Sequence, residues 1–427
     1  MGKKKWMRKV LALSLAFLTA VPQSSTWAGV QIGTAYEAQA DGSLVRVGDI
    51  TGEWIQRSDG VYWQQEDGSI YRKGGWFTVD GKKYFLAYTS GRRKTGWVTY
   101  KDRQYYMDLQ TGELLTGWQD IDGKRYYFDA KTGALHKGGW LTRGKNKYYI
   151  KKDGTATIGY VSVKGKKYYM KPKYGIMLKG WMTSGSKKYY FGTDGARASG
   201  FTTVSGTTYY FDTKWGYAVT GWKTIGNSKY YFGSDGAMRT GLQTISGKKY
   251  IFDNKGAMIT SKAVYKEGSS YYRIASSGAA TAFTRKVDIL ACQRLEALGW
   301  SLPAAFNWAA SRPYQTTPQT IPYGYSQAQY YGEYGLENGL GDCYVMACIF
   351  YCCAHVLGYQ VRFIKGYVPS RSGAVSTHGW VEIYYNGAWR LCDPNFTYNT
   401  KRNGYMIYYG MSGTWRYINY GMVDKNF

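Results

Sequence analysis

Three residues in the C-terminal part of the chain are of the types that together perform nucleophilic catalysis. Cys343 lies in the stretch GDCYVMACIFYCCAHVLGY, and His378 and Asp393 lie in THGWVEIYYNGAWRLCDPNF. A cysteine thiolate attacks carbonyl groups, a histidine holds and returns the proton, and a carboxylate orients the imidazole. These residue types, in this order, predict a catalytic triad for acyl transfer.

The position predicted for Cys343 suits a reactive thiol. Asp342 can cap a helix that runs from about Cys343 to Leu357 and ends at Gly358. Cys343 would then lie in the first turn, where free backbone N–H groups and the helix dipole stabilise a thiolate. The other cysteines of this segment, Cys348, Cys352 and Cys353, lie further along the same helix.

These other cysteines are predicted to be buried free thiols. Cys352 and Cys353 point about 100° apart on a helix, and two cysteines on one helical turn rarely form a disulfide. By residue type alone, a metal site is suggested by Cys348, Cys352, Cys353 and His355. The sequence has no second pair of ligand residues with zinc-like spacing, however. We therefore predict no metal and no cofactor.

The chain has three histidines, and only His378 is placed to serve Cys343. His136 lies in a repeat turn and His355 lies within the predicted cysteine helix. His378 begins a predicted hairpin, because Asn-Gly at residues 386–387 is a favoured two-residue turn between alternating strands.

The predicted register of this hairpin brings His378 and Asp393 together. If Tyr385 pairs with Ala388, then His378 faces Asn395 across the hairpin. Asp393 is then the diagonal neighbour of His378 on the same face, with roughly 7–8 Å between the backbones of the two residues. Asp393 is thus the predicted partner of the imidazole, and Asn395 is a second possible orienter. The competing interpretation is an ordinary surface histidine beside a turn aspartate.

Before residue 282 the sequence repeats every 20 to 22 residues. The unit is clearest in GWQDIDGKRYYFDAKTGALHKG and returns about ten times. Each unit predicts one β-hairpin, and a lone hairpin cannot bury its aromatic face, so successive hairpins must stack into a β-solenoid. The leading residues of the units are Trp54, Trp76, Trp97, Trp118, Trp140, Tyr160, Trp181, Phe201, Trp222 and Leu242.

We therefore predict a multidomain protein, with a β-hairpin solenoid followed by a C-terminal α+β domain. Residues 1–28 resemble a signal peptide, with cleavage after Ala28 or, as a second candidate, after Ala40. Residues 29–73 form an N-terminal segment with a degenerate repeat, 74–281 the repeat solenoid and 282–427 the catalytic domain. The leader predicts secretion and non-covalent attachment to the cell surface, with no transmembrane anchor.

The net charge is +28, of which +19 falls on residues 29–281. An exported basic module indicates an anionic polymer as partner, and export argues against nucleic acid. The repeats resemble the cell-wall-binding repeats of Gram-positive surface proteins, including choline- and glucan-binding modules. That resemblance implies carbohydrate or choline binding between aromatic side chains. The candidate ligand contacts are Trp97, Trp118, Trp140, Trp181, Trp222, Tyr127, Tyr149, Tyr190 and Tyr231.

One departure from the choline-binding pattern changes the expected ligand. Where those repeats usually have Trp before the tyrosine pair, this chain has Arg125, Lys147, Lys167, Lys188 or Lys229. A cation at that place repels a quaternary ammonium, which favours a glycan or an anionic wall polymer over choline. The alternative is that the tryptophans only fill the solenoid core.

The two C-terminal stretches, GLGDCYVMACIFYCCAHVLGYQVRFIKGYV and THGWVEIYYNGAWRLCDPNF, together resemble the transglutaminase-like superfamily. The resemblance implies a papain-like α+β fold with Cys343 as nucleophile, His378 as general base and acid, and Asp393 as orienter. Gly379 and Cys392 stand where Ala and Leu are more usual. The backbone N–H of Cys343, with Tyr323, Tyr325 or Gln327, is the expected oxyanion donor.

The resulting hypothesis is a secreted, wall-associated cysteine enzyme that acts on peptide or glutamine amides. Hydrolysis, as in a cysteine protease, is favoured over cross-linking. Two other functions remain open, a non-catalytic cell-wall-binding adhesin and a peptidoglycan amidase or endopeptidase.

Overall fold

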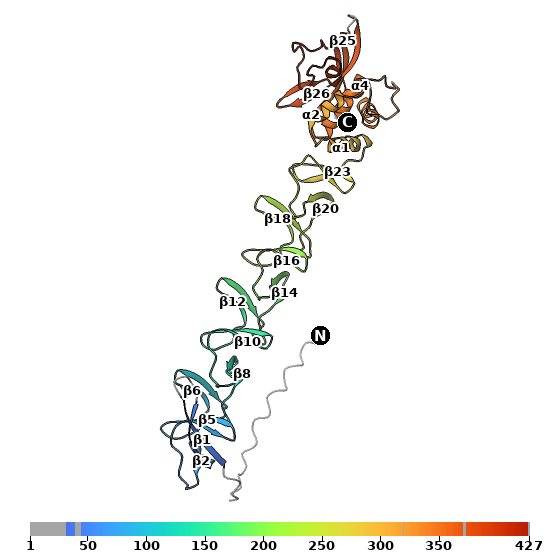
Figure 1. The fold of residues 1–427 in the computed structure, drawn as a ribbon. Coiled ribbons are helices and arrows are strands. Elements are labelled where there is room, and N and C mark those ends of the chain that lie inside the picture. Colours follow the sequence, from blue (N-terminus) through green and yellow to red (C-terminus); the bar gives the residue numbers. More distant parts are fainter. Residues whose placement is uncertain (1–30, 39–43, 319, 370–372, 426–427) are drawn as a thin grey trace, which may run out of the picture. The chain divides into compact units, whose positions relative to one another are not determined.

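The computed structural model describes residues 31–38, 44–318, 320–369 and 373–425 (Figure 1). The predicted leader and both of its candidate cleavage sites lie outside these residues. The chain forms two compact units. One holds the described residues up to Met182 together with Tyr190–Arg197, and the other holds Thr183–Tyr189 together with the residues from Ala198 onward.

The first unit begins with a five-stranded sheet of order β3-β2-β1-β4-β5 and continues as separate hairpins. The strands of the sheet are β1 (Gln31–Ala38), β2 (Leu44–Arg57), β3 (Gly60–Gln65), β4 (Gly75–Val79) and β5 (Lys82–Leu86). The hairpins are β6 (Gly96–Tyr100) with β7 (Arg103–Met107), β8 (Gly117–Ile121) with β9 (Lys124–Phe128), β10 (Gly139–Arg143) with β11 (Asn146–Ile150), and β12 (Gly159–Val163) with β13 (Lys166–Met170). The boundary of the units falls within β14 (Gly180–Ser184) and β15 (Lys187–Phe191).

Successive hairpins are joined by the segment that follows each tyrosine pair. In that segment the Ala156 N–H donates to the Arg125 carbonyl, and the Met177 N–H donates to the Lys147 carbonyl, each at 2.8 Å. The last residue of the aromatic strand is fully buried, as Phe128 and Ile150 are. Each repeat thus completes the core of its neighbour, which is the reason that single hairpins persist without a wide sheet.

The second unit carries the remaining repeats. It contains the hairpins β16 (Gly200–Val204) with β17 (Thr207–Phe211) and β18 (Gly221–Ile225) with β19 (Ser228–Phe232). A five-stranded sheet of order β20-β21-β24-β23-β22 follows, formed by β20 (Gly241–Ile245), β21 (Lys248–Phe252), β22 (Val264–Glu267), β23 (Ser270–Ile274) and β24 (Ala279–Ala282). The prediction of one hairpin per repeat is confirmed.

Beyond the repeats the same unit folds as an α+β domain, as predicted. Its sheet has the order β27-β26-β25-β28, and helix α4 packs on β25 and β26. The strands are β25 (Val361–Pro369), β26 (Val375–Tyr385), β27 (Ala388–Cys392) and β28 (Ile418–Lys425). The helices are α1 (Lys286–Ala297), α2 (Leu302–Ala310), α3 (Gln327–Asn338), α4 (Cys343–Val356) and α5 (Pro394–Thr400). Helices α1, α2 and α3 cover the remaining faces of α4, so this cysteine-bearing helix is the centre of the core.

The predicted hairpin register is confirmed. Tyr385 pairs with Ala388 and Glu382 pairs with Leu391, and the ladder ends at Val381 with Cys392. The polar, Pro-containing stretch between residues 301 and 329 holds helix α2 and the start of α3. Ser301 caps α2 and Ser326 caps α3 through their side-chain oxygens, and such Ser caps begin helices even in polar sequence.

The last repeat strands also pack against the helices. Val264 on β22 and Tyr271 on β23 are buried in the same hydrophobic cluster as α1 and α4. The Tyr271 hydroxyl donates to Glu296 Oε2 at 2.5 Å, and Arg273 Nη2 donates to the His355 carbonyl at 3.1 Å. The core of the α+β domain therefore includes residues before position 282, where the composition of the sequence changes.

Among the described residues, no helix is long and apolar enough to cross a membrane. Within the same residues, no group of three or more His, Cys, Asp or Glu side chains is arranged to hold a metal ion.

Candidate active site

Helix α4 begins at Cys343, as its cap predicts. Asp342 Oδ1 accepts the backbone N–H groups of Tyr344 and Val345 at 3.0 and 3.2 Å. Its other oxygen, Oδ2, accepts the Thr317 hydroxyl at 2.5 Å. Because Asp342 is buried and held from both sides, it fixes the first turn of the helix and with it the position of the Cys343 thiol, which is only 7% exposed.

Strand β26 places His378 against Asp393, the residue that precedes α5. His378 Nε2 lies 2.8 Å from Asp393 Oδ2, and both residues are buried, with Asp393 fully excluded from solvent. The β26–β27 ladder stops one residue before Asp393, which caps α5 by accepting the Phe396 N–H at 2.9 Å. The end of the ladder thus frees the carboxylate to turn toward the imidazole.

The second ring nitrogen of His378 is the one left for Cys343. The Cys343 side chain is among the groups that raise the pKa of His378, and since Nε2 faces Asp393, Nδ1 is the nitrogen that remains for the sulfur. Two tryptophans pack against the ring. Trp380 stacks at a centroid distance of 6.0 Å, and Trp415 contacts it edge-on at 5.0 Å. The site thus brings a thiol, an imidazole and a carboxylate together, with the imidazole bonded to the carboxylate.

The electrostatics of the site favour a protonated imidazole. Burial lowers the pKa of His378, but the Asp393 charge and hydrogen bond, with the bond to Cys343, outweigh it and raise this pKa from 6.5 to about 10. An imidazolium placed beside a cysteine stabilises negative charge on sulfur. The site therefore places a positively charged imidazole beside the sulfur, an arrangement suited to a cysteine nucleophile.

The other five cysteines are buried free thiols, which agrees with the prediction for Cys348, Cys352 and Cys353 and extends it to Cys292 and Cys392. Burial raises the pKa of Cys292, Cys353 and Cys392 to about 12, and it raises the pKa of Cys348 and Cys352 as well. These thiols stay protonated near neutral pH and pack as small apolar groups.

Asn395, the second predicted orienter, does not face His378. Its amide nitrogen points to Met346 Sδ at 3.6 Å, and its oxygen accepts from Asn399 at 2.9 Å. Asn395 sits inside α5, which begins at Pro394, so the strand register assumed for it does not extend that far. This part of the prediction is wrong, and Asp393 alone holds the imidazole.

Tyrosines that the sequence analysis did not select lie next to the thiol. Burial is the main cause that raises the pKa of Tyr314 and Tyr344, and the nearby Cys343 contributes to the rise in both. The Tyr344 ring occupies the space beside Gly379, where a Cβ atom would come within 2.6 Å of it. The glycine that departs from the family pattern therefore makes room for Tyr344. By contrast, the suggested oxyanion donor Tyr323 is fully exposed, and Tyr325 is 40% exposed.

A second candidate site recurs along the repeats, where tryptophans lie at the surface. Trp97 and Trp181 are 41% exposed, whereas the fully buried residues of the repeats are those that end the aromatic strands, such as Phe128. Trp118, Trp140 and Trp222 are half-buried. Trp118 and Trp140 also pack against hydrophobic clusters of the repeats, so the same side chains contribute to the core and remain partly exposed. Tyr149, Tyr190 and Tyr231 are also half-buried, but Tyr127 is only 5% exposed.

Four of these tryptophans are each flanked by two tyrosines, namely Trp97, Trp118, Trp140 and Trp222. The cross-strand partner of each is the second tyrosine of the pair, as for Trp222 with Tyr231 at a centroid distance of 5.1 Å. The first tyrosine of the next hairpin closes the other side, as Tyr250 does for Trp222 at 4.9 Å. The sequence analysis missed this second set. Its members are Tyr126 beside Trp97, Tyr148 beside Trp118, Tyr168 beside Trp140 and Tyr250 beside Trp222.

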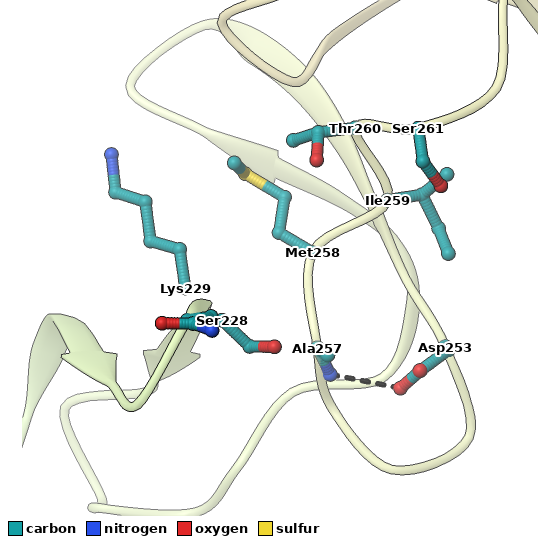
Figure 2. Close-up of a pocket in the computed structure, with 9 residues that line it drawn as sticks. Ser228, Lys229, Asp253, Ala257, Met258, Ile259, Thr260 and Ser261 are labelled. Carbon is teal, nitrogen blue, oxygen red and sulfur yellow. Dashed lines mark hydrogen bonds between the residues drawn. The ribbon is translucent and has the colours of Figure 1, made fainter.

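The protein's own cations lie over these tryptophans. Lys229 Nζ is 4.6 Å from the centroid of Trp222, Lys147 Nζ is 4.9 Å from that of Trp140, and the Arg125 guanidinium is 5.2 Å from that of Trp118. Beside Lys229 lies a hollow of about 300 Å³, also lined by Met258, Asp253 and the hydroxyls of Thr260 and Ser261 (Figure 2). The ring face that would take a cationic ligand is therefore already covered by a cation.

Comparison with known families agrees with both halves of this description. Residues 304–394, which contain Cys343, His378 and Asp393, match the family model of the transglutaminase-like superfamily. Residues 115–159, 219–241 and 239–283 match the choline-binding repeat, and residues 179–196 match the putative cell wall binding repeat. A search of the curated proteins gave no match.

Several solved structures resemble the repeats. CbpJ from Streptococcus pneumoniae TIGR4 is 27% identical, with a TM-score of 0.40, over 54% of this chain and 94% of that one. Choline binding protein F from Streptococcus pneumoniae is 25% identical, with a TM-score of 0.38, over 54% and 93%. The modular autolysin LytC from the same species is 22% identical, with a TM-score of 0.34, over 55% and 52%.

The chain thus joins a transglutaminase-like domain to choline-binding-type cell-wall repeats. That combination indicates an enzyme attached to the cell wall.

Proposed function

We propose that this protein is a secreted cysteine enzyme that cleaves peptide or glutamine amides at the cell wall, with Cys343, His378 and Asp393 as its catalytic residues. The observation that carries the proposal is the buried His378–Asp393 pair, whose imidazole interacts with the Cys343 thiol at the start of a capped helix. The other five cysteines lack such a partner set and are held as neutral thiols.

The reaction proceeds through a thioester. The Cys343 sulfur attacks the amide carbonyl carbon, and the C–N bond breaks as His378 Nδ1 gives its proton to the departing amine. Water then attacks the thioester carbon, His378 takes a proton from it, and the carboxylic acid leaves as the thiol re-forms. An amine in place of water gives transamidation by the same steps, so the acceptor decides between hydrolysis and cross-linking.

Selective alkylation tests the nucleophile. We expect iodoacetamide near pH 6.5 to label Cys343 rapidly in the mature full chain and to leave the other five cysteines unlabelled, because they are buried and protonated. Timed quenching and mass spectrometry assign each site. His378→Ala should slow the labelling of Cys343, since the imidazolium beside the sulfur is lost.

His355→Ala is the matched control, because His355 lies at the far end of α4. It should leave the labelling rate of Cys343 unchanged. Slow or scattered labelling in the unaltered protein would reject the triad and favour a non-catalytic wall-binding adhesin. Release of muropeptides from purified walls would instead identify a peptidoglycan amidase or endopeptidase.

We further propose that the repeats bind a wall glycan or an anionic wall polymer, and not choline. The cations over Trp118, Trp140 and Trp222 support this, because each pairs a positive charge with an aromatic face. A sugar ring can stack on the face of an exposed aromatic ring, such as Trp97 or Trp181, while a phosphate or carboxylate group can pair with the cations. Binding of this kind weakens as the salt concentration rises.

Removing the cations should create choline binding. We expect the double variant Lys147→Trp with Lys229→Trp to bind choline about tenfold more tightly than the unaltered protein, because each change removes a repelling charge and adds an aromatic wall. Tryptophan fluorescence titration measures the affinity. Lys152→Trp with Lys255→Trp, two connecting-segment lysines that no tryptophan contacts among the described interactions, provides the control for added tryptophan. Equal choline affinity in the unaltered protein and the double variant would refute the assignment.

A further inference from the structure

The Asp393 carboxylate accepts a side-chain hydrogen bond from Tyr417 in addition to the one from His378. Oδ2 accepts from His378 Nε2 at 2.8 Å and also from the Tyr417 hydroxyl at 2.9 Å, while Oδ1 accepts the Phe396 N–H at 2.9 Å. Asp393 is fully buried, so water does not share in this arrangement. The imidazole and the phenol thus compete for the same oxygen.

Tyr417 is held rigidly in this position. It is 8% exposed, its ring packs on Trp380 at a centroid distance of 4.7 Å, and the Tyr409 ring meets it edge-on at 5.8 Å. Burial, with the Asp393 charge and hydrogen bond, raises the pKa of Tyr417 far above its ordinary value. The phenol therefore remains protonated near neutral pH and acts as a hydrogen-bond donor to Asp393.

We propose that Tyr417 is a positioning residue of the candidate active site, which fixes the Asp393 carboxylate and limits how strongly Oδ2 binds the imidazole. This inference rests on the proposed function, because His378 matters only if it serves Cys343. A carboxylate that accepts two bonds on one oxygen gives less charge to each donor. Tyr417 would thereby keep the imidazolium oriented without holding its proton too firmly for transfer.

The charged and titratable neighbours of this cluster are few. His378 faces Asp393 and Cys343, and its other neighbours are the rings of Trp380 and Trp415. Tyr417 faces Asp393, Tyr409 and the Cys392 thiol, and burial keeps Cys392 neutral by raising its pKa to about 12. A change in the charge of Asp393 or of His378 therefore acts directly on the hydrogen bond between these two residues.

The test is Tyr417→Phe in the full chain, which deletes one oxygen and keeps the packed ring. The chain has three histidines, so ¹⁵N-histidine NMR resolves His378 when His378→Ala supplies the assignment. We expect the Nε2–H proton of His378 to move downfield at pH 7, because Oδ2 now serves a single donor. The titration midpoint of His378 should rise by roughly one unit, and Cys343 alkylation should change its pH profile accordingly.

Tyr409→Phe is the control, since Tyr409 lies in the same aromatic cluster but bonds Trp380 Nε1 and Glu382 instead of Asp393. It should leave the His378 resonance and midpoint unchanged, even where it lowers the stability of the domain. A Tyr417→Phe protein whose His378 resonance and midpoint match the unaltered protein would overturn the inference. If Cys343 proves unreactive in the unaltered protein, the proposed function fails while the NMR coupling between residues 417 and 378 is still measured.

Discussion

Replacing Asp393 with asparagine should lower the pKa of His378 from about 10 to below 6.5. Burial lowers the pKa of this imidazole, whereas the Asp393 carboxylate raises it. Burial is the largest single influence on this pKa. Once the charge of Asp393 is removed, burial acts unopposed and disfavours the imidazolium. The substitution preserves the shape of the side chain, so the effect isolates the charge.

The loss of the imidazolium should abolish most of the reactivity of Cys343. At pH 6.5 we expect iodoacetamide to alkylate Cys343 slowly in the Asp393→Asn variant, and any amidase activity to fall by about 10³- to 10⁴-fold, as when the carboxylate of a catalytic triad is neutralised. Mass spectrometry of the labelled protein and a fluorogenic amide substrate measure the two effects.

The same substitution should reverse the dependence of stability on pH. In the unaltered protein the folded pKa of His378 lies above the unfolded value of 6.5, so its stabilising contribution is complete below about pH 6.5 and is lost as the pH rises toward 10. In Asp393→Asn the folded pKa falls below the unfolded one, and stability is instead lost as the pH falls below about 6.5. The difference between the two proteins should reach a few kcal/mol near pH 6.

Asp424→Asn is the matched control for this series. Asp424 on β28 accepts the Ala328 N–H at 2.7 Å and does not contact His378. It should leave the His378 titration and the Cys343 alkylation rate unchanged. If Asp393→Asn leaves the His378 pKa near 10, a carboxylate other than Asp393 governs the imidazole, and the triad is incorrect as drawn.

Local signals explain why the helix start and the hairpin register of the candidate active site were predicted correctly. The start of α4 follows from one capping aspartate, Asp342, and the register of β26 and β27 follows from the Asn-Gly turn at residues 386–387. Each signal acts within a few residues, so no knowledge of distant packing was needed. With both in place, the meeting of His378 and Asp393 follows from the sequence.

Features that depend on distant packing were missed. Tyr417 lies 24 residues beyond Asp393, and no motif connects the two, so only the folded chain reveals their hydrogen bond. Asn395 was misplaced because α5 begins immediately after Asp393 and ends the strand geometry that the prediction had extended. The second set of ring-flanking tyrosines was missed for a related reason, since each comes from the neighbouring hairpin.

Packing crosses the border that composition places between the repeats and the α+β domain. The predicted catalytic domain starts at residue 282, where the repeats end in sequence. Yet Tyr271 on β23 is buried among the helices, whereas its neighbour Tyr272 is buried in the repeat cluster with Ile251 and Ile274. We propose that the catalytic domain needs the last repeat strands, from Val264 onward, to complete its core.

Truncating Tyr271 to alanine should therefore destabilise the helices around Cys343. Tyr271 is 4% exposed and donates to Glu296, so its loss removes a packed ring and a part-buried hydrogen bond from the face of α1. We expect the free energy of unfolding of this domain to fall by about 3–5 kcal/mol, as for other large aromatic truncations in a core. The buried thiols of Cys292 and Cys353 report the change, because both lie in the same cluster.

In the full chain, timed labelling of Cys292 and Cys353 with a thiol reagent should be at least about 100-fold faster in Tyr271→Ala, because labelling requires opening of the core. Tyr272→Ala deletes an equally buried ring on the other face of β23 and should leave the labelling rates of Cys292 and Cys353 nearly unchanged. Equal protection of these thiols in both variants would show that the helices fold without β23, and that the domain begins where the repeats end in sequence.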